Sequence, residues 1–441
     1  MFTSAALHAS PARVSAASSG RLPVPTRARP FAKTQRPTPL PLRLLLGRPL
    51  APTAEEYAAA CDDLRVGDPA MDAVVVWMQE VGMATGRALF MRAVREGVEA
   101  IPDCPQALRV FFDGLRQPPR WIEPEAIQDG VRFVQGVGLH ANWVLRDLAL
   151  MGGYLMSGFN QSLVKTGALD KGTSARVAET GAWWMHCTEP DVDQPGSMAW
   201  QSTLHVRLVH ALVRQHLSRQ PDWDEDHWGV PLSQTDMVAT YLGFSVAMLG
   251  GLRKLGLPVT PRESRGVMHL WAYVGWLMGV SPGWLARSEQ DGIVLLYHTV
   301  LTQSPPDDTS RQLGHALSRE PLARHFTHLQ TLQRWLAYHQ HLSVSRYFLT
   351  AKQMHQLGLP GGILPWYPVL TLPARVGRYS LMRFLPPLRD RLVRKGRAEQ
   401  AAALRTLFGR EEAQVLRLSA GHPGAAHSGV GQAARATGGR S

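Results

Sequence analysis

The chain has 441 residues, of which 45% are hydrophobic, and it carries a formal net charge of +12. Residues 1–50 hold eight Lys or Arg and no acid, residues 374–441 hold thirteen against four, and residues 51–373 therefore hold 26 against 31. The length and composition allow a substantial core in one large domain or two ordinary ones, whereas a mildly acidic body argues against specific nucleic-acid binding, which usually needs a basic folded surface.

The basic ends fit loose attraction to an anionic membrane better than a nucleic-acid interface. Cys61, Cys104 and Cys187 form no metal-binding spacing, and their odd number without a secretory signal indicates a reducing compartment. No uncharged apolar run is long enough to span a bilayer. We therefore expect a cytoplasmic protein, with peripheral membrane contact through the basic tails as an open alternative.

Residues 1–50 are rich in Pro, Arg, Ser and Ala, and we expect a disordered basic leader there. The same composition also resembles a transit peptide, so both interpretations stay open. Folding is expected to begin near Thr53, because Thr-Ala-Glu-Glu is typical of a capped helix start.

From residue 51 to residue 373 the pattern is helical. Apolar residues recur at three- and four-residue spacing in segments 74–78, 88–98 and 107–115, and no alternating runs of Val, Ile and Thr stand out. Loops between helices are predicted where Gly, Pro and Asp gather, at 188–197, 219–231, 257–264 and 303–309. We therefore expect an all-α domain over 51–373.

The C-terminal part divides into three predicted segments. Residues 357–373 are rich in Gly and Pro and are expected to form an extended strap that closes the domain. Residues 374–419 combine apolar and basic residues, which predicts a basic amphipathic helical extension, either packed on the core or resting on a membrane. Residues 420–441 are expected to be a disordered tail.

A helix predicted over 200–217 carries a distinctive polar stripe. At about 100° per residue, Arg207, His210 and Arg214 fall within roughly 60° of one another, whereas His205 lies about 140° from His210. A neutral imidazole can bind haem iron and arginines can pair with propionates. By periodicity alone, a surface histidine on an exposed polar face remains the more common interpretation.

A second predicted helix, over 174–186, places Arg176, Glu179, Thr180 and Trp183 on one face at spacings of three, four and seven residues. An arginine beside a glutamate is ordinarily an ion pair. A cation and a hydroxyl can also stabilise negative charge that develops on a reacting oxygen.

These two segments, Arg176-Val-Ala-Glu-Thr and Arg207-Leu-Val-His-Ala-Leu-Val-Arg, resemble the family of the latex clearing protein (rubber oxygenase) and the endoplasmic-reticulum-bound oxygenase of mycophenolic acid synthesis. The resemblance includes the thirty-residue separation of Thr180 and His210 and extends over about residues 130–300. The supporting motifs are Leu148-Ala-Leu-Met-Gly-Gly-Tyr, Leu163-Val-Lys-Thr-Gly, Trp228-Gly-Val-Pro-Leu-Ser-Gln-Thr-Asp, Leu252-Arg-Lys-Leu-Gly and Leu270-Trp-Ala-Tyr-Val-Gly-Trp-Leu-Met-Gly-Val.

The resemblance implies a globin-like helical core around a haem b, with additional helices. It makes His210 the axial ligand of the haem iron and puts Arg176 and Thr180 on the other face of the haem. It leaves Arg207 and Arg214 to hold propionates or to support the helix of His210.

This chain differs from the family at two positions. Where the rubber oxygenase has a lysine directly before the threonine, this chain has Glu179. Where it has a carboxylate sixteen residues before the arginine, the count reaches Asn160, which cannot abstract a proton. Either Glu179 has taken the role of base, or the chemistry differs.

The function implied by the resemblance is an enzyme, an oxygenase that uses O₂ to oxidise a hydrophobic, isoprenoid-like substrate and to cleave its carbon–carbon double bond. One alternative is a tailoring monooxygenase or peroxygenase on the same scaffold. Another is a haem protein without enzymatic activity, for storage or gas sensing. The substrate and any redox partner are not encoded in a recognisable motif.

Overall fold

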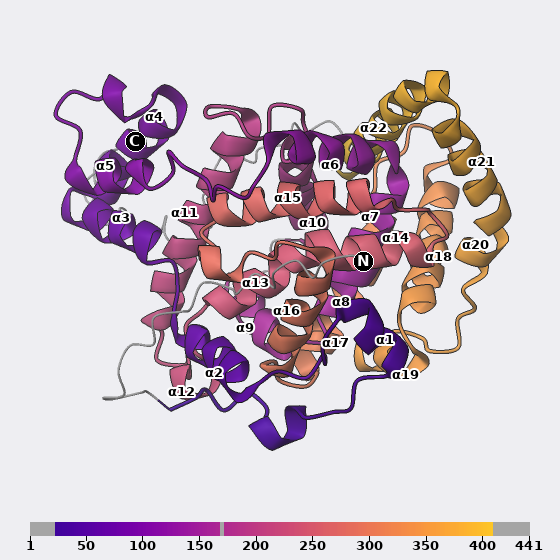
Figure 1. Cartoon of the computed structure of the whole chain (residues 1–441), viewed down its shortest axis with the longest axis horizontal. Helices are drawn as coiled ribbons and strands as arrows, with labels where there is room; N and C mark the ends of the chain where they lie inside the picture. Colours follow the sequence, from indigo (N-terminus) through magenta and orange to yellow (C-terminus); the bar gives the residue numbers. More distant parts are fainter. Residues whose placement is uncertain (1–22, 168–171, 409–441) are drawn as a thin grey trace, which may run out of the picture.

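The computed structural model describes residues 23–167 and 172–408 and contains only helices and loops within these ranges, which confirms the all-α prediction (Figure 1). In chain order the helices are α1 (Leu40–Leu46), α2 (Ala54–Asp62), α3 (Pro69–Glu80), α4 (Met83–Glu96), α5 (Gln106–Asp113), α6 (Pro124–Gly136), α7 (Leu139–Val144), α8 (Met151–Gly153), α9 (Ser157–Lys165), α10 (Thr173–His186), α11 (Met198–Ser218), α12 (Glu225–Trp228), α13 (Gln234–Leu242), α14 (Met248–Lys254), α15 (Pro261–Leu277), α16 (Glu289–Leu301), α17 (Asp308–Arg319), α18 (Gln330–Phe348), α19 (Ala351–Gln356), α20 (Trp366–Leu370), α21 (Leu372–Phe384) and α22 (Pro386–Phe408).

Helix α15 forms the middle of the core, with α6 packed along it (Figure 1). Its residues Leu270, Trp271 and Ala272 have no accessible surface. The two helices approach closely because Gly130 and Gly266 face each other, so that a Cβ built on either one would lie within 2.5 Å of the other's backbone. The apolar residues of 266–277 therefore meet protein on all sides, which a helix at the surface would not need.

Two continuous helical stretches of the core contain π-helical segments. Segment η4 (Leu145–Leu150) joins α7 to α8, and segment η5 (Gly243–Ala247) joins α13 to α14. The two segments pack against each other. Wide helical turns of this kind are rare and are often found next to functional sites, so the surroundings of η4 and η5 are candidate locations for such a site.

One described stretch, 234–254, is long and apolar enough to cross a bilayer by length and composition. Of its most apolar window, 72% is buried inside the protein. This burial is what a core helix of a folded domain shows.

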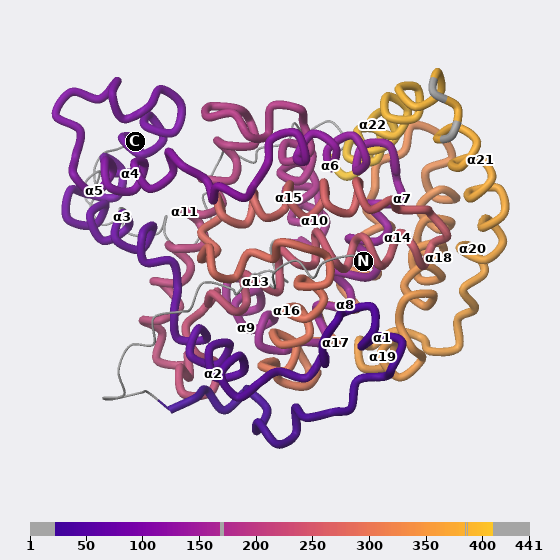
Figure 2. The backbone as a smooth tube through the Cα atoms, viewed as in Figure 1, coloured from indigo at the N-terminus to yellow at the C-terminus, as the bar shows by residue number. Residues whose placement is uncertain are grey.

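The N-terminal segment differs from the expectation of a disordered leader. Residues 23–50 follow one edge of the body (Figure 2), with a 3₁₀ turn at Phe31–Thr34 and helix α1. Their anchor is Arg27, which is 4% exposed and donates from Nη2 to Asp236 Oδ1 at 2.6 Å. Composition could not indicate this pairing, because Asp236 lies 209 residues away along the chain. Residues 1–22 lie outside the described ranges.

Helix α2 begins as the sequence predicted. Thr53 accepts a hydrogen bond from the Glu56 amide, and the Glu56 side chain accepts one from the Thr53 amide. This reciprocal pair satisfies two backbone donors that a helix start otherwise leaves open.

The C-terminal helices close one side of the domain. Helix α22 packs against α6 and α10, and the buried Gln400 donates to the carbonyls of Val134 and Gly138. The basic extension is therefore joined to the body as far as residue 408. The strap expected at 357–373 is partly helical, because α20 and the start of α21 lie in it. Residues 409–441, including the tail expected at 420–441, lie outside the described ranges.

Candidate functional site

The predicted site residues lie on two neighbouring helices, α10 and α11. Helix α11 begins where Ser197 accepts a hydrogen bond from the Trp200 amide, and it runs for 21 residues. Trp183 on α10 donates from Nε1 to Thr203 Oγ1 on α11 at 3.0 Å. This bond joins the two helices that carry the predicted side chains.

His210 lies half-buried near the middle of α11. Desolvation lowers the pKa of His210 to about 4; the charge of Arg214 lowers it as well, while Asp68 opposes the shift. Its Nδ1 is buried and has no hydrogen-bond partner among the described residues. The side chain is therefore a neutral imidazole at physiological pH that the described protein groups do not engage.

The side of α11 that carries His210 is only locally accessible. Leu204, Leu208 and Ala211 have no accessible surface. Half-buried residues occur on several sides of the helix and include Val206, Val209, His210, Leu212, Val213, Gln215 and His216. Arg207 and Arg214, which share the side of His210, are only 6% and 4% exposed, so the half-buried imidazole lies beside two buried arginines.

The α10 group has a mixed environment. Arg176 and Glu179 are half-buried and Thr180 is exposed. Burial raises the pKa of Tyr154 while the charge of Arg176 opposes that shift, so the guanidinium lies near this buried phenol. No hydrogen bond or ion pair between described residues joins Arg176 or Thr180 to His210.

Arg207 and Arg214 are engaged with helix α3. Arg207 donates from Nε and Nη2 to both carboxylate oxygens of Asp68, at 2.6 and 2.8 Å, and from Nη1 to the Leu277 carbonyl at 3.0 Å. Arg214 donates from Nε to Asp72 at 3.2 Å and from Nη1 to the Leu232 carbonyl, also at 3.2 Å. These contacts support the helix of His210; a role toward a propionate stays a prediction.

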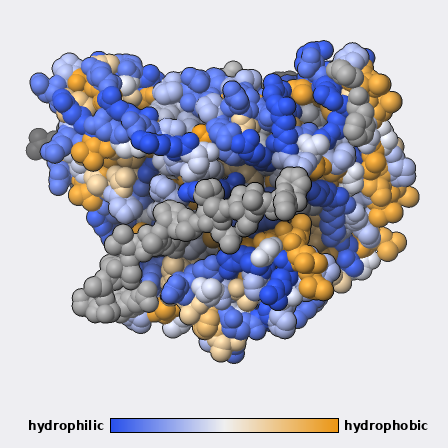
Figure 3. All heavy atoms as spheres, viewed as in Figure 1, coloured by the Kyte–Doolittle hydropathy of each residue, from blue (hydrophilic) through white to orange (hydrophobic). Residues whose placement is uncertain are grey.

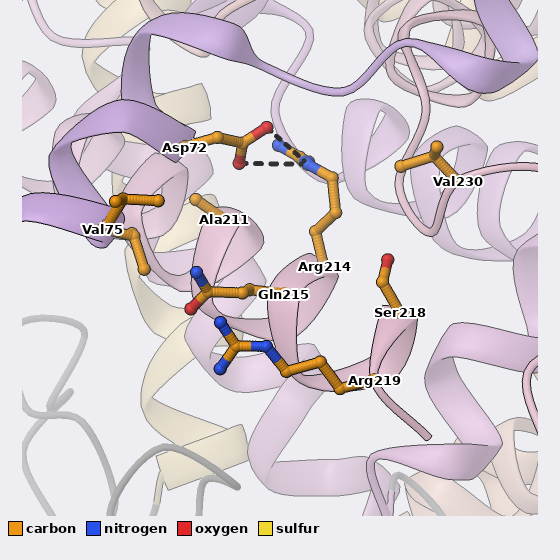
Figure 4. Close-up of a pocket in the computed structure, with 9 residues that line it drawn as sticks. Asp72, Val75, Ala211, Arg214, Gln215, Ser218, Arg219 and Val230 are labelled. Atoms are coloured by element: carbon orange, nitrogen blue, oxygen red, sulfur yellow. Dashed lines mark hydrogen bonds and ion pairs between the residues drawn. The ribbon is translucent and has the colours of Figure 1, made fainter. Parts of the chain in front are cut away.

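A small cavity of about 250 Å³ lies between α3 and α11 (Figure 4). It is lined by Asp72, Val75, Val76, Ala211, Arg214, Gln215, Ser218, Arg219 and Val230. His210 is not among them, whereas Arg214, which lies only about 40° from His210 around the helix, is. The cavity therefore lies next to the stripe of Arg207, His210 and Arg214 without including the imidazole, and no sequence motif predicted it.

A buried network of charged side chains includes Arg146 and Asp147 of segment η4. Arg146 pairs with Asp147 at 2.5 Å and with Glu320 at 2.9 Å, and Asp147 Oδ2 lies 2.7 Å from His341 Nδ1. Desolvation lowers the pKa of His341 to about 4, with the charge of Arg146 acting in the same direction and Asp147 against it. None of the predicted site residues belongs to this network, although two adjacent charges at 146–147 within an apolar stretch were a signal for it.

Asn160 occupies the position where the count along the chain places the carboxylate of the rubber oxygenase. It has no accessible surface, and its Nδ2 donates to the Tyr154 carbonyl at 2.9 Å and to Ser310 Oγ at 3.2 Å. Its Oδ1 is buried without a partner in the described part of the chain. An amide held in this way can orient a neighbour but cannot act as a base.

The described residues include no group of three or more His, Cys, Asp or Glu side chains that could hold a bare metal ion. A b-type haem requires only one protein nitrogen on its iron. His210 fits that requirement, because its imidazole is neutral and half-buried and its Nδ1 has no hydrogen-bond partner in the described part of the chain.

Three comparisons relate the chain to known proteins. Residues 136–385 match the family model described as the catalytic domain of ER-bound oxygenase mpaB/B′ and rubber oxygenase. The match extends beyond the range 130–300 that the motifs covered and includes helices α18 to α21. It also contains every predicted site residue from Arg176 to Arg214.

A rubber oxygenase from Streptomyces sp. (strain K30) is 25% identical over 215 residues, which make up 46% of this chain and 52% of the relative. The chain thus spans about half the length of this curated relative. The solved structure of latex clearing protein in the closed state is similar with a TM-score of 0.53 and 18% identity, covering 77% of this chain and 91% of that one. At this identity the structural likeness concerns the fold.

Proposed function

The chain belongs to the family of ER-bound oxygenases mpaB/B′ and rubber oxygenases, and we propose that it is a haem b-dependent oxygenase. Its proposed reaction is the O₂-dependent cleavage of a carbon–carbon double bond in a hydrophobic, isoprenoid-like substrate. The observation that carries the proposal is His210, a neutral, half-buried imidazole inside the matched domain whose Nδ1 has no hydrogen-bond partner among the described residues.

The residues of this chain have separate tasks in the proposed mechanism. When bound, the haem supplies the iron that activates O₂. His210 holds the iron, while Arg207 and Arg214 fix the helix of His210 to α3. On α10, Arg176 provides a positive charge and Thr180 a hydroxyl donor, which stabilise negative charge that develops during oxidation. Glu179 holds or moves a proton at its carboxylate.

The ligand assignment predicts that His210→Ala strips the haem or leaves it loosely bound, because no second protein nitrogen is expected on the iron. A matched control is His216→Ala on the same helix, since His216 points about 120° away and contacts Gln220. The measurement is the Soret absorbance per mole of purified protein. Equal haem content in wild type and His210→Ala would rule out the assignment, and a wild type without any Soret band would rule out the proposed cofactor.

If Arg176 and Thr180 act on the face of the haem opposite His210, Arg176→Ala and Thr180→Ala should keep the fold and lower turnover by about tenfold or more. This factor corresponds to roughly 1.4 kcal/mol of transition-state stabilisation. Arg132→Ala is a suitable control, because this exposed arginine pairs only at the surface, with Asp129. Oxygen uptake with a polyisoprenoid substrate is the measurement. Turnover within about twofold of wild type for both variants would contradict the assignment.

A monooxygenase reaction is the second candidate, and Asn160 favours it, because an amide stands where the cleaving relative has a carboxylate. Product masses distinguish the two reactions. Cleavage gives two carbonyl fragments, whereas monooxygenation gives one oxygenated molecule. A haem protein without substrate-dependent oxygen uptake would instead be the storage or sensing protein considered above.

A further inference from the structure

The outer surface of α20, α21 and the loop before them is apolar. Figure 3 shows this surface as an orange rim on the side of the molecule where Figure 1 places both helices. Six large apolar residues of this stretch are exposed, namely Leu364 (74%), Trp366 (41%), Val369 (51%), Leu370 (73%), Leu381 (61%) and Leu385 (45%). Exposed apolar residues that follow one another in this way are uncommon on a monomeric domain and mark interaction surfaces. We call them the apolar rim.

The apolar rim is held in a fixed orientation by the inner side of α21. The buried Arg375 donates to the carbonyls of Leu255 and Pro368, both at 2.9 Å. One helical turn later Tyr379 is buried, and Arg383 donates to the Pro258 carbonyl at 2.6 Å. The helix is therefore anchored on one side while Leu370 and Leu381 remain outside, so their exposure does not come from a detached segment.

Basic residues accompany the apolar rim along the chain. Between residues 364 and 400 there are eight Lys or Arg and two Asp or Glu. Five of these basic residues are exposed, namely Arg378, Arg389, Arg391, Arg394 and Lys395. Exposed apolar side chains next to a positive cluster match the chemistry of an anionic lipid surface, where the former enter the acyl boundary and the latter meet the headgroups.

We propose that the apolar rim and the adjacent basic residues form a docking face for an anionic membrane. An anionic bilayer accounts for both features, the exposed leucines and the exposed basic residues. The proposal stands on this surface alone and does not depend on haem or on the proposed chemistry. If the substrate is isoprenoid-like, docking would bring the enzyme to the phase in which that substrate dissolves.

The test is co-sedimentation of the full-length protein with phosphatidylcholine vesicles that contain or lack phosphatidylserine, at low and high salt. We expect pelleting that requires phosphatidylserine and weakens as salt screens the charges. Leu370→Glu/Leu381→Glu should weaken binding by about tenfold or more, since it removes apolar contact and adds repulsion. Arg391→Glu/Arg394→Glu should also weaken it by about tenfold or more, since it replaces attraction to the headgroups by repulsion.

The control is Val110→Glu, which adds a single negative charge at a valine 65% exposed on α5, at the opposite end of the molecule (Figure 1). It should bind vesicles like wild type. All variants should keep the melting temperature and the Soret absorbance of wild type, which separates docking from folding and from haem binding. Absent pelleting at low salt, or binding by the Leu370/Leu381 variant equal to that of Val110→Glu, would overturn the proposal. If the protein instead forms a dimer without vesicles, and the leucine substitutions dissociate that dimer, the apolar rim binds a second copy of the chain.

Discussion

Two of the motifs that resemble the oxygenase family contribute residues next to one buried ion pair, that of Arg207 and Asp68. Gly279, from the motif that ends α15, has a φ of +99°, and a Cβ there would lie 2.5 Å from Asp68 Oδ2 and 2.8 Å from Arg207 Nε. Gln234, from the motif that precedes α13, donates to the carbonyls of Gly67 and Gly279 at 2.8 and 2.9 Å. These residues hold the helix of His210 in place without reaching its imidazole.

We expect Arg207→Met to lower the free energy of unfolding by about 3–5 kcal/mol, because it leaves the Asp68 carboxylate buried and unpaired. Adding Asp68→Asn should restore a part of this loss, since the amide is uncharged and can still cap α3 at the Met71 amide. Denaturant unfolding of both variants checks the prediction. A loss no larger than that of Arg132→Met, at an arginine whose side chain is 63% exposed, would contradict it.

At the scale of helices, the crossing of α6 and α15 depends on glycine. A Cβ on Gly266 would lie 2.4 Å from the Gly130 amide nitrogen and 2.8 Å from the Ala126 carbonyl oxygen. Both are backbone atoms, which cannot turn aside as a flexible side chain could. The close packing of the central helix therefore requires glycine at this position.

We predict opposite effects for two Gly→Ala substitutions in helices. Gly266→Ala should destabilise the protein by about 1–3 kcal/mol, because overpacking forces the two helices apart. Gly250→Ala on α14 should stabilise it by up to about 1 kcal/mol, because no described atom lies within 4 Å of the new methyl group and alanine favours a helix. Melting curves of the two variants check the signs, and equal shifts would contradict the role of the crossing.

The elements that depend on local sequence were predictable, and those that depend on distant partners were not. The helices of the site were expected at 174–186 and 200–217 and are found at Thr173–His186 and Met198–Ser218. The order of residues 23–50 was missed, because it rests on Arg27 and a carboxylate far along the chain. The network of Asp147 was missed for the same reason, since its histidine lies 194 residues away.

The site itself was predictable only in part. The spacing predicted that Arg207, His210 and Arg214 share one side of a helix. In the structure Arg207 and Arg214 do lie on the same side, where they pair with Asp68 and Asp72. Spacing could not indicate that Asp68 and Asp72 would engage these arginines, because those carboxylates come from a helix more than a hundred residues earlier. The roles of Arg176, Glu179 and Thr180 stay predictions.

At the scale of the whole molecule, desolvated histidines link stability to pH. Desolvation lowers the pKa of the half-buried His140 and of the buried His341 to about 4, below the ordinary value of about 6.5. Both are thus neutral in the folded protein at pH 7. Burial opposes the ionisation of Glu320, but its partners Arg146, which is buried, and Arg324, which is half-buried, prevail and lower the pKa of that carboxyl to about 2.

These shifts fix the direction of the pH dependence. As the pH falls from about 6.5 to about 4, the unfolded chain takes up protons that the folded histidines refuse, so the protein loses stability by up to about 1.4 kcal/mol per pH unit for each histidine. The contribution of Glu320 is present above about pH 4.5 and is lost only as the pH falls from there toward 2. Acid should therefore weaken the fold in two steps, the histidines first.

We predict that the melting temperature falls steadily between about pH 7 and pH 5, before the carboxylates begin to titrate. His140→Gln should make this fall less steep, because an amide can still donate to the Val137 carbonyl as His140 Nδ1 does and does not titrate in this range. His216→Gln on α11 is the matched control for the histidine-to-glutamine change itself, and its slope should equal that of wild type. Melting curves of the three proteins at several pH values give the slopes. A wild-type melting temperature that is constant between pH 7 and pH 5 would show that His140 and His341 do not control acid stability.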